Sequence, residues 1–398
     1  MKVKKVRAHS GKSPPVDKTL LLYIFGLLIF GVVMIYDATV AVAQSNFGGP
    51  YKFLFHHLAW VLLGLLGFFF FMNYNYKHLG KISYFLFFLS LLLLLVPAII
   101  GFFDIVGVLN CEKSLSFVPC VNGAYRWVYL NPPPFPEIPF LGVLGFQPAE
   151  FAKLALVIYL SVQIGIKAKE KMTPFWLFLV ATGIVSFLVL LQPNMSTAVL
   201  IFLIGVFIYF SSGLTLYPLM ATLPMIGILG GGAVLSSPYR RQRLLTLIGM
   251  SEGDDLSLGY HIRQILIALG SGGLLGVGFG QSRQKYQYLP EVSADSIFAI
   301  IGEELGFIGT TALVVLFGFF IIKGFDIAKN APDLPGKMLA VGITSWIGLQ
   351  FFINVAAMTK LIPLTGIPIP LISYGGSSTV FSLMGLGILA NVSRYSKA

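Results

Sequence analysis

The chain has 398 residues, of which 56% are hydrophobic and only 11% are charged. A soluble protein of this length would carry about 25% charged residues, so the composition excludes a soluble enzyme and indicates a membrane protein. The formal charge of +11 does not point to nucleic acid, because most basic residues flank apolar segments, as expected for positive charge retained on the cytoplasmic side.

Apolar stretches close to 20 residues recur along the whole sequence, and each is long enough to cross a bilayer as a helix. We therefore predict an all-α polytopic membrane protein that forms a single domain over residues 1–398. About ten spans are expected, at 19–42, 54–73, 82–103, 147–166, 173–191, 196–212, 216–236, 297–323, 336–358 and 374–393.

Basic residues predict which side of the membrane each connection faces. Residues 1–18 are rich in lysine, and the apolar stretch after them is too long for a cleaved signal peptide, so we expect a cytoplasmic tail and a retained first span. The same side receives further basic segments, at 77–81, 167–171, 323–337 and 394–397. Both termini are then cytoplasmic, and the long connections 104–146 and 238–296 are extracellular, the second lying between spans seven and eight.

The segment QPAEFAKLALVIYL opens the fourth predicted span at its outer end. Glu150 and Lys153 are three residues apart, so they share a helix face and can pair. Buried Glu–Lys pairs are often structural, but a lysine at this depth could also hold a phosphate. Both interpretations are open.

The loop 238–296 begins with a cluster of arginines and continues into LIALGSGGLLGVGFGQ, which we interpret as a re-entrant or interfacial segment. Arg240, Arg241 and Arg243 could bind phosphate through their forked guanidinium groups, or could attract anionic lipid headgroups. A lipid that carries a pyrophosphate would satisfy both interpretations.

The stretch EVSADSIFAIIGEELG, residues 291–306, sets acids against the start of the eighth span. Ionised carboxylates are costly in hydrocarbon and usually mark function. Asp295 stands at the outer mouth, where burial would raise its pKa toward that of a general base, although Ser293 or Asp295 could equally cap the helix. Glu303 and Glu304 lie further along the span. They could bind substrate, or they could be structural acids that bind a neighbouring arginine or backbone groups.

The segment KLIPLTGIPIPLISYGGSS precedes the last span, and its prolines cannot all sit in one regular helix. We predict a broken helix whose backbone lines a cavity, with Ser377 near a helix N-terminus that favours anions. The sequence carries no Walker loop, GxSxG or CxxC motif and no pattern typical of a metal site.

Together these segments resemble the SEDS family (shape, elongation, division and sporulation), the FtsW/RodA type of bacterial cell-wall proteins. The motifs that carry the resemblance occur in the family's order: NGAYRW, QPAEFAKL, QPNMSTAV, YRRQRL, LPEVSADSIFAIIGEELG, QFFINVAAM and LIPLTGIPIPLISYGGSS. The segments GVVMIYDATV and GEELGF are more similar to the division-type FtsW branch than to the elongation-type RodA branch.

The resemblance implies a peptidoglycan glycosyltransferase that polymerises lipid II into glycan strands at the outer face of the cytoplasmic membrane during cell division. Asp295 matches the family's essential carboxylate and would be the general base. The expected ligands of the substrate and its pyrophosphate are Arg240, Arg243, Lys153, Glu150, Arg126, Trp127, Glu303 and Ser377. A divalent cation, Mg²⁺ or Mn²⁺, could assist the leaving group, whereas no organic cofactor is expected.

The resemblance also implies partners and a place in the cell. Lipid II is the expected substrate, a class B penicillin-binding protein (a transpeptidase) and other division proteins are the expected protein partners, and membrane lipids surround the spans. The chain would be a multi-pass protein of the bacterial cytoplasmic membrane at the division septum.

The sequence departs from the family pattern around the expected base. Ser293 and Ala294 replace a polar pair that usually precedes the acid, and Ser296 replaces an aromatic residue. Asn194 stands where many members have an aspartate. The expected acid itself is present.

Two rival functions remain. A flippase for lipid II would also have broken helices and a charged cavity, but it should carry charges toward the bilayer centre, whereas here they gather on the outer side. A non-catalytic division scaffold would tolerate replacement of Asp295 as long as its complex still formed.

Cys111 and Cys120 lie close together in the extracellular loop 104–146, so we predict a disulfide that staples this loop. A thiol count on the non-reduced protein should return none, and two free thiols would rule the disulfide out.

Overall fold

The protein is described by a computed structural model. It covers residues 14–396 except 48, 108–114, 122, 137, 139–141, 170–173, 216, 236–237, 249–255 and 287. Cys111 is outside these residues, so its pairing with Cys120 stays a prediction.

Each predicted span corresponds to a helix. In chain order these are α1 (Lys18–Phe47), α2 (Lys52–Asn73), α3 (Leu79–Ile105), α4 (Pro148–Lys169), α5 (Phe175–Leu190), α6 (Met195–Ser211), α7 (Tyr217–Leu235), α10 (Ile297–Lys329), α11 (Leu334–Met358) and α12 (Gly376–Tyr395). Among the described residues, seven helices are long and apolar enough to cross a membrane, and α5 and α6 are shorter apolar helices. The all-α polytopic fold is therefore confirmed.

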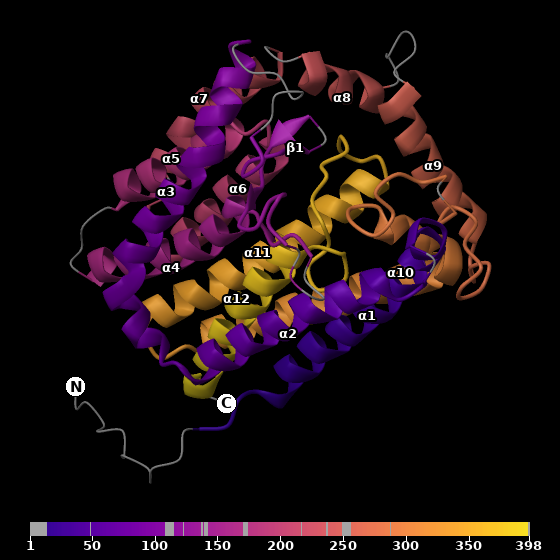
Figure 1. Cartoon of the computed structure of the whole chain (residues 1–398). Coiled ribbons are helices and arrows are strands. Elements are labelled where there is room, and N and C mark those ends of the chain that lie inside the picture. The colour runs from indigo at the N-terminus through magenta and orange to yellow at the C-terminus, as the bar shows by residue number, and fades with distance from the viewer. Residues whose placement is uncertain are drawn as a thin grey trace.

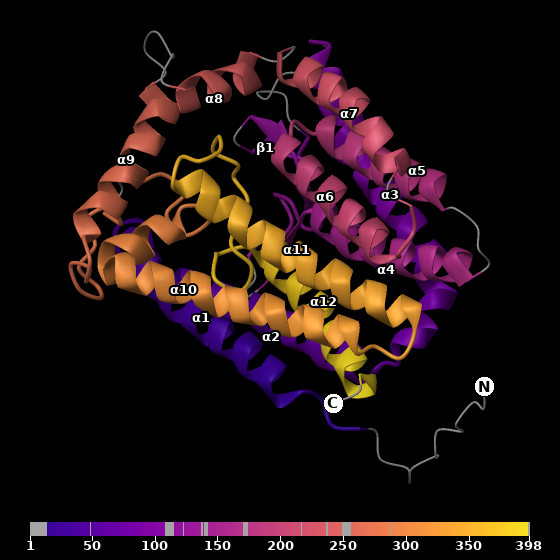
Figure 2. The same cartoon turned by 180° about the vertical axis from the view of Figure 1, so that it is seen from behind.

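Three helices form the centre of the bundle, because they bury most of their apolar length against other helices. The buried share of the most apolar window is 89% for α4, 83% for α12 and 78% for α11. These three helices pack against one another (Figure 2). The share is only 22% for α2 and for α10, so much of their apolar surface is left for lipid.

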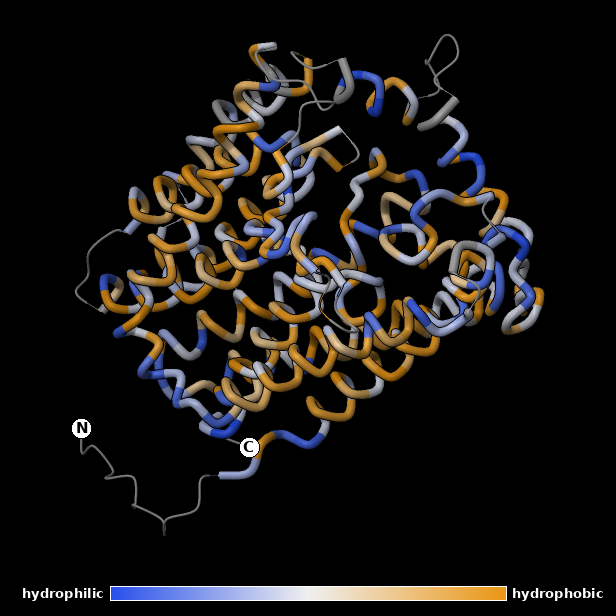
Figure 3. The backbone as a smooth tube through the Cα atoms, viewed as in Figure 1, coloured by the Kyte–Doolittle hydropathy of each residue, from blue (hydrophilic) through white to orange (hydrophobic). Residues whose placement is uncertain are grey.

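The two ends of the bundle differ in what they carry. The start of α1 and the end of α12 lie at one end, and α8 (Pro238–Ile248) and α9 (Leu256–Gly272) form an arm at the opposite end (Figure 1). The tube is hydrophobic along most helices, and hydrophilic stretches gather near the termini and along this arm (Figure 3). This distribution agrees with a cytoplasmic end at the termini and an outer end at the arm.

Short elements complete the connections. A single 3₁₀ turn, η1 (Tyr76–His78), joins α2 to α3. In the connection between α3 and α4, β1 (Cys120–Val121) pairs antiparallel with β2 (Ala124–Tyr125). Likewise β3 (Val128–Tyr129) pairs antiparallel with β4 (Gly145–Phe146), which leads directly into α4.

The regular helix predicted over 297–323 is interrupted, because Gly306 has a non-helical backbone within α10 (φ 67°, ψ −166°). The glycine-rich segment after α9 docks on this break and supplies the missing hydrogen bonds. Gly273 O and Leu274 O accept from the N–H groups of Phe307 and Ile308 at 2.9 and 3.1 Å. In return, the carbonyls of residues 303 and 304 accept from the N–H groups of residues 277 and 278. A break in a membrane helix is tolerated where protein satisfies its backbone in this way.

Replacing Gly306 by alanine should destabilise the fold by about 2 kcal/mol or more. The φ is positive, and an added Cβ would lie 2.3 Å from the backbone N of Gly276. Gly318 in the same helix is the control, since a Cβ there meets nothing within 4 Å. Thermal unfolding in detergent should show a lower midpoint for Gly306→Ala and an unchanged or higher midpoint for Gly318→Ala. Equal midpoints would contradict this account of the break.

Candidate active site

A cavity of about 360 Å³ opens among the outer ends of the helices. Its walls are mainly apolar side chains of α6, α7, α8 and α11 together with the loop before α12, and two arginines add positive charge. The lining includes Arg126, Asn194, Met195, Val199, Leu203, Val234, Arg243, Leu244, Ile353, Ile362 and Leu364. The cavity therefore combines a hydrocarbon-like wall with cationic groups, which suits an anionic lipid.

Arg126 and Arg243 reach this cavity from different connections at the outer end of the bundle. Arg126, in the loop between β2 and β3, donates to the backbone carbonyls of Gln192 (3.4 Å) and Pro193. Arg243, on α8, donates from Nη1 to the carbonyl of Leu364 at 2.7 Å. The two guanidinium groups thus tie four outer connections together at the cavity rim. The side chain of Arg240 lies outside the described residues.

Asp295 lies in the loop immediately before α10, close to Gly366, the residue that follows the cavity-lining segment 362–365. Its carbonyl accepts from Asn354 Nδ2 of α11 at 2.7 Å, which fixes the backbone at this point. A Cβ on Gly366 would lie 3.7 Å from Asp295 Oδ2, so this oxygen faces the glycine. Asp295 is not among the residues that line the cavity, but the glycine that it faces directly follows the cavity-lining residue Thr365.

The carboxylate of Asp295 is 9% exposed. Burial raises its pKa to about 7, the negative charge of Glu291 acts in the same direction, and the positive charge of Arg243 opposes both. The N-cap residue of α10 is Ser296, so the alternative role of Asp295 as the helix cap is not seen. A buried carboxylate with a pKa near neutrality is suited to general base chemistry.

Glu150 and Lys153 form a buried ion pair at the start of α4, with Lys153 Nζ 2.8 Å from Glu150 Oε1. Lys153 also donates to Gln350 Oε1 at 2.8 Å and lies 5.2 Å from the ring centroid of Trp346. This lysine already has protein partners, so the geometry favours the structural interpretation of the pair over a phosphate ligand.

Ser377 holds the connection between α3 and α4 against α12, and Trp127 packs within that connection. Ser377 Oγ accepts from the N–H of Gln147 at 3.1 Å and donates to the carbonyl of Gly145 at 3.4 Å. Trp127 packs beside Gly145 on the neighbouring strand. Neither residue lines the cavity; Ser377 docks the loop on α12, and Trp127 packs inside the loop.

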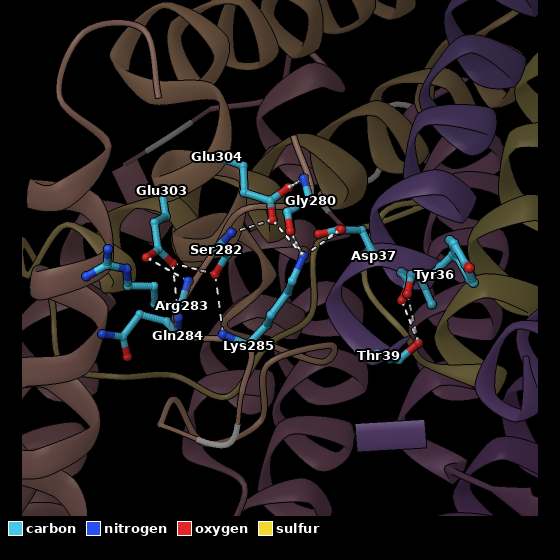
Figure 4. Close-up of polar contacts among 11 residues, drawn as sticks. Tyr36, Asp37, Thr39, Gly280, Ser282, Arg283, Gln284, Lys285, Glu303 and Glu304 are labelled. Carbon is cyan, nitrogen blue, oxygen red and sulfur yellow. Dashed lines mark hydrogen bonds and ion pairs between the residues drawn. The ribbon is translucent and has the colours of Figure 1, made fainter. Parts of the chain in front are cut away.

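Glu303 and Glu304, the acids inside the eighth span, bind the loop after α9 (Figure 4). Glu303 accepts from Ser282 Oγ and from the N–H groups of Arg283 (3.1 Å) and Gln284 (3.3 Å). Its oxygens are therefore occupied by protein groups, and the geometry does not support the prediction that Glu303 binds substrate. The alternative prediction, a satisfied structural acid, describes what is seen.

A lysine that the sequence analysis did not single out joins this loop to two helices (Figure 4). Lys285 is 1% exposed, and its Nζ lies 2.7 Å from Asp37 Oδ1 of α1 and 3.0 Å from Glu304 Oε1 of α10. It also donates to the carbonyl of Gly280 at 2.8 Å. The available signal was Asp37, an acid within the first apolar span, for which a buried basic side chain is one common partner.

Replacing Lys285 by methionine should destabilise the protein by about 3–5 kcal/mol, because two buried carboxylates would lose their counter-ion. Lys323 provides a matched control, since it also pairs with two acids, Asp17 and Asp326, but its side chain is 25% exposed. Lys323→Met should cost less than about 1 kcal/mol. Thermal unfolding in detergent compares the two, and equal losses would contradict the structural role of Lys285.

Comparisons with known proteins agree with this architecture. Residues 18–398 match the model of the cell cycle proteins FtsW, RodA and SpoVE. The chain is 37% identical over 388 residues to stage V sporulation protein E of Bacillus subtilis, covering 96% of this chain and 98% of that protein. It is 32% identical over 389 residues to "Probable peptidoglycan glycosyltransferase FtsW" of Geobacter sulfurreducens, covering 95% of each.

Two solved structures share the fold. A chain from a peptidoglycan synthase complex that coordinates polymerization and crosslinking matches with a TM-score of 0.72 and 26% identity, covering 95% of this chain and 98% of that one. The rod shape determining protein RodA of Thermus thermophilus matches with a TM-score of 0.63 and 24% identity, covering 95% and 97%. The chain therefore belongs to the SEDS family, the cell cycle proteins FtsW, RodA and SpoVE.

Proposed function

We propose that this chain is a peptidoglycan glycosyltransferase that polymerises lipid II at the outer face of the bacterial cytoplasmic membrane, with Asp295 as the general base. The observation that carries the proposal is the buried Asp295 carboxylate beside a cavity with apolar walls and two arginines. Lipid II joins a long hydrocarbon tail, a pyrophosphate and a sugar. The apolar wall would contact the tail, the arginines would bind the pyrophosphate, and the carboxylate would act on the sugar hydroxyl.

The reaction joins two sugars and releases a lipid pyrophosphate. Asp295 accepts the proton of the attacking sugar hydroxyl. At the same time the oxygen of that hydroxyl bonds to the anomeric carbon of the donor sugar. The bond from that carbon to the pyrophosphate oxygen breaks, and its electron pair leaves with the lipid pyrophosphate. Because this leaving group departs as a stable anion, a second carboxyl acting as general acid is less needed than in glycoside hydrolases.

Arg126 and Arg243 are the proposed ligands of the departing pyrophosphate. Both line the cavity and hold a fixed position through bonds to backbone carbonyls. Guanidinium groups that are held in place in a dry site stabilise developing negative charge without reorganising. The same two charges would bind lipid II before the reaction through its pyrophosphate.

The residues described do not themselves form a metal cage. No group of three or more His, Cys, Asp or Glu side chains is placed to hold a metal ion in the part of the chain that the structure describes. If Mg²⁺ or Mn²⁺ assists the reaction, we propose that it arrives bound to the pyrophosphate.

The placement of charge favours an enzyme over a flippase. The buried charged side chains of the described residues all belong to the outer half of the bundle or its outer loops: Asp37, Glu150, Lys153, Lys285, Asp295, Glu303 and Glu304. A carrier that moves a pyrophosphate across the bilayer would also need polar or charged side chains near the bilayer centre and the inner end. A surface enzyme needs them only where the headgroup sits.

We propose a class B penicillin-binding protein as the partner and the division septum as the site of action. The structural relative from a peptidoglycan synthase complex supports association with a crosslinking partner, and the FtsW relatives support a role in division.

Asp295→Asn should abolish glycan-strand formation from labelled lipid II, by about 100-fold or more, because an amide cannot accept the proton. Purified wild type should polymerise, with its transpeptidase partner present and the partner's own activity blocked. The wild-type rate should rise as the pH passes about 7, since only the ionised carboxylate is a base.

Asp326→Asn is the control for this substitution, because Asp326 is an exposed acid at the cytoplasmic end of α10 and should tolerate the change. Equal polymer from wild type and an equally well folded Asp295→Asn would remove Asp295 from the mechanism. No polymer from either protein would favour the flippase or the scaffold.

A further inference from the structure

Two side chains connect Asp295 to the arm of the outer loop. Ser296 Oγ lies 3.4 Å from Asp295 Oδ1, to which it donates, and 2.8 Å from Nε2 of His261 on α9. Ser296 is fully buried and His261 is half-buried. The three side chains therefore form a continuous polar path from α9 to the carboxylate.

The orientation of Ser296 is unusual for its position. It is the N-cap residue of α10, yet its side chain makes no capping hydrogen bond. A serine at an N-cap ordinarily accepts from a backbone N–H of the first turn and stabilises the helix in that way. Here the hydroxyl is turned away from the helix and toward Asp295 and His261. The helix loses its cap, and the carboxylate gains a donor.

The protonation states along this path follow from its surroundings. Burial, aided by the positive charge of Arg243, lowers the pKa of His261 to about 4, so the imidazole is neutral near pH 7. If the hydroxyl hydrogen of Ser296 points to Asp295, the serine oxygen can only accept from the histidine. Nε2 then carries the histidine proton, which sets the tautomer.

We propose that His261 and Ser296 are positioning residues for Asp295: His261 orients the Ser296 hydroxyl, and Ser296 holds Oδ1 so that Oδ2 is presented as the base. The proposal deepens the function above and rests on it. Oδ2 is the oxygen that faces Gly366, where the missing side chain leaves room beside it. The chain thus divides the carboxylate into a held oxygen and a reactive oxygen.

Two charged side chains near Asp295 shift the pKa of its carboxyl group in opposite directions. Glu291 in its own loop disfavours the ionised carboxylate, whereas Arg243 of α8 favours it. Asn354 of α11 is neutral and binds the backbone carbonyl. A hydrogen bond donated to a carboxylate also favours its ionised form. Removing the Ser296 hydroxyl should therefore raise the pKa of Asp295 and move the acid limb of the activity to higher pH.

The test compares pH profiles of lipid II polymerisation by the full chain with its transpeptidase partner present. Ser296→Ala should move the acid limb upward by about half a pH unit, a modest shift because the bond is long. The polymerisation rate of Ser296→Ala should fall mainly at pH values below the acid limb, and it should largely return to the wild-type rate at high pH. Ser296→Thr, which keeps a hydroxyl, should restore the wild-type profile.

Two further substitutions separate the path from general effects. His261→Gln keeps a donor to the serine and should lie close to wild type, whereas His261→Leu should resemble Ser296→Ala. Ser382→Ala is the matched control, since Ser382 is a fully buried serine on α12 whose hydroxyl has no hydrogen-bond partner among the residues that the structure describes. It should leave the profile unchanged.

A second readout does not depend on activity. Infrared difference titration follows the carboxyl band that Asp295→Asn removes, and its midpoint should rise in Ser296→Ala. An unchanged midpoint, or a loss of rate that is equal at every pH, would overturn the positioning role while leaving Asp295 as the base. Absence of polymer from the wild type would instead overturn the proposed function, and the infrared midpoint would still decide whether the hydrogen-bonded path exists.

Discussion

The outer end of the bundle depends on one buried ammonium group. Lys285 sits between a carboxylate of α1 and a carboxylate of α10, and it comes from the loop that leads to Asp295. Charges in such an environment stabilise the fold only when every partner is present, because each alone would remain desolvated. The same loop is fixed a second time where the glycine-rich segment fills the break at Gly306. A loop held by ion pairs and by backbone bonds can present a carboxylate in one position.

The polar residues of the outer end then fall into two groups with different tasks. Glu303, Glu304, Glu150 and Lys153 have their partners within the protein and hold loops and helices together. Arg126, Arg243 and Asp295 border the cavity or its wall, where a substrate headgroup can meet them. This division explains why so many acids lie against a membrane helix. Most of them build the site, and one of them is proposed to act in it.

Hydropathy predicted the spans well, because the need to satisfy every backbone group in lipid leaves helices as nearly the only choice. The motifs led to Asp295 and to the two cavity arginines, since both the residue types and their outer position pointed to chemistry. The break at Gly306 was not predicted, because a glycine alone does not show that another segment will dock on it. Lys285 was missed for a related reason: its partner Asp37 is 248 residues away, and only the fold brings them together. For Glu303 the sequence left a substrate ligand and a satisfied structural acid both open, because its partners, Ser282 Oγ and two backbone N–H groups, come from a loop that only the fold brings to α10.

The central claim is that the headgroup of lipid II is held at the outer end, with its pyrophosphate on the arginines and a sugar hydroxyl at Asp295. An experimental structure of the chain with an unreactive lipid II analogue tests this most directly. The account predicts the pyrophosphate within hydrogen-bond reach of Arg126 and Arg243, the tail along the apolar cavity wall, and the acceptor hydroxyl within reach of Asp295 Oδ2. A headgroup bound near the centre or the cytoplasmic end of the bundle would contradict it.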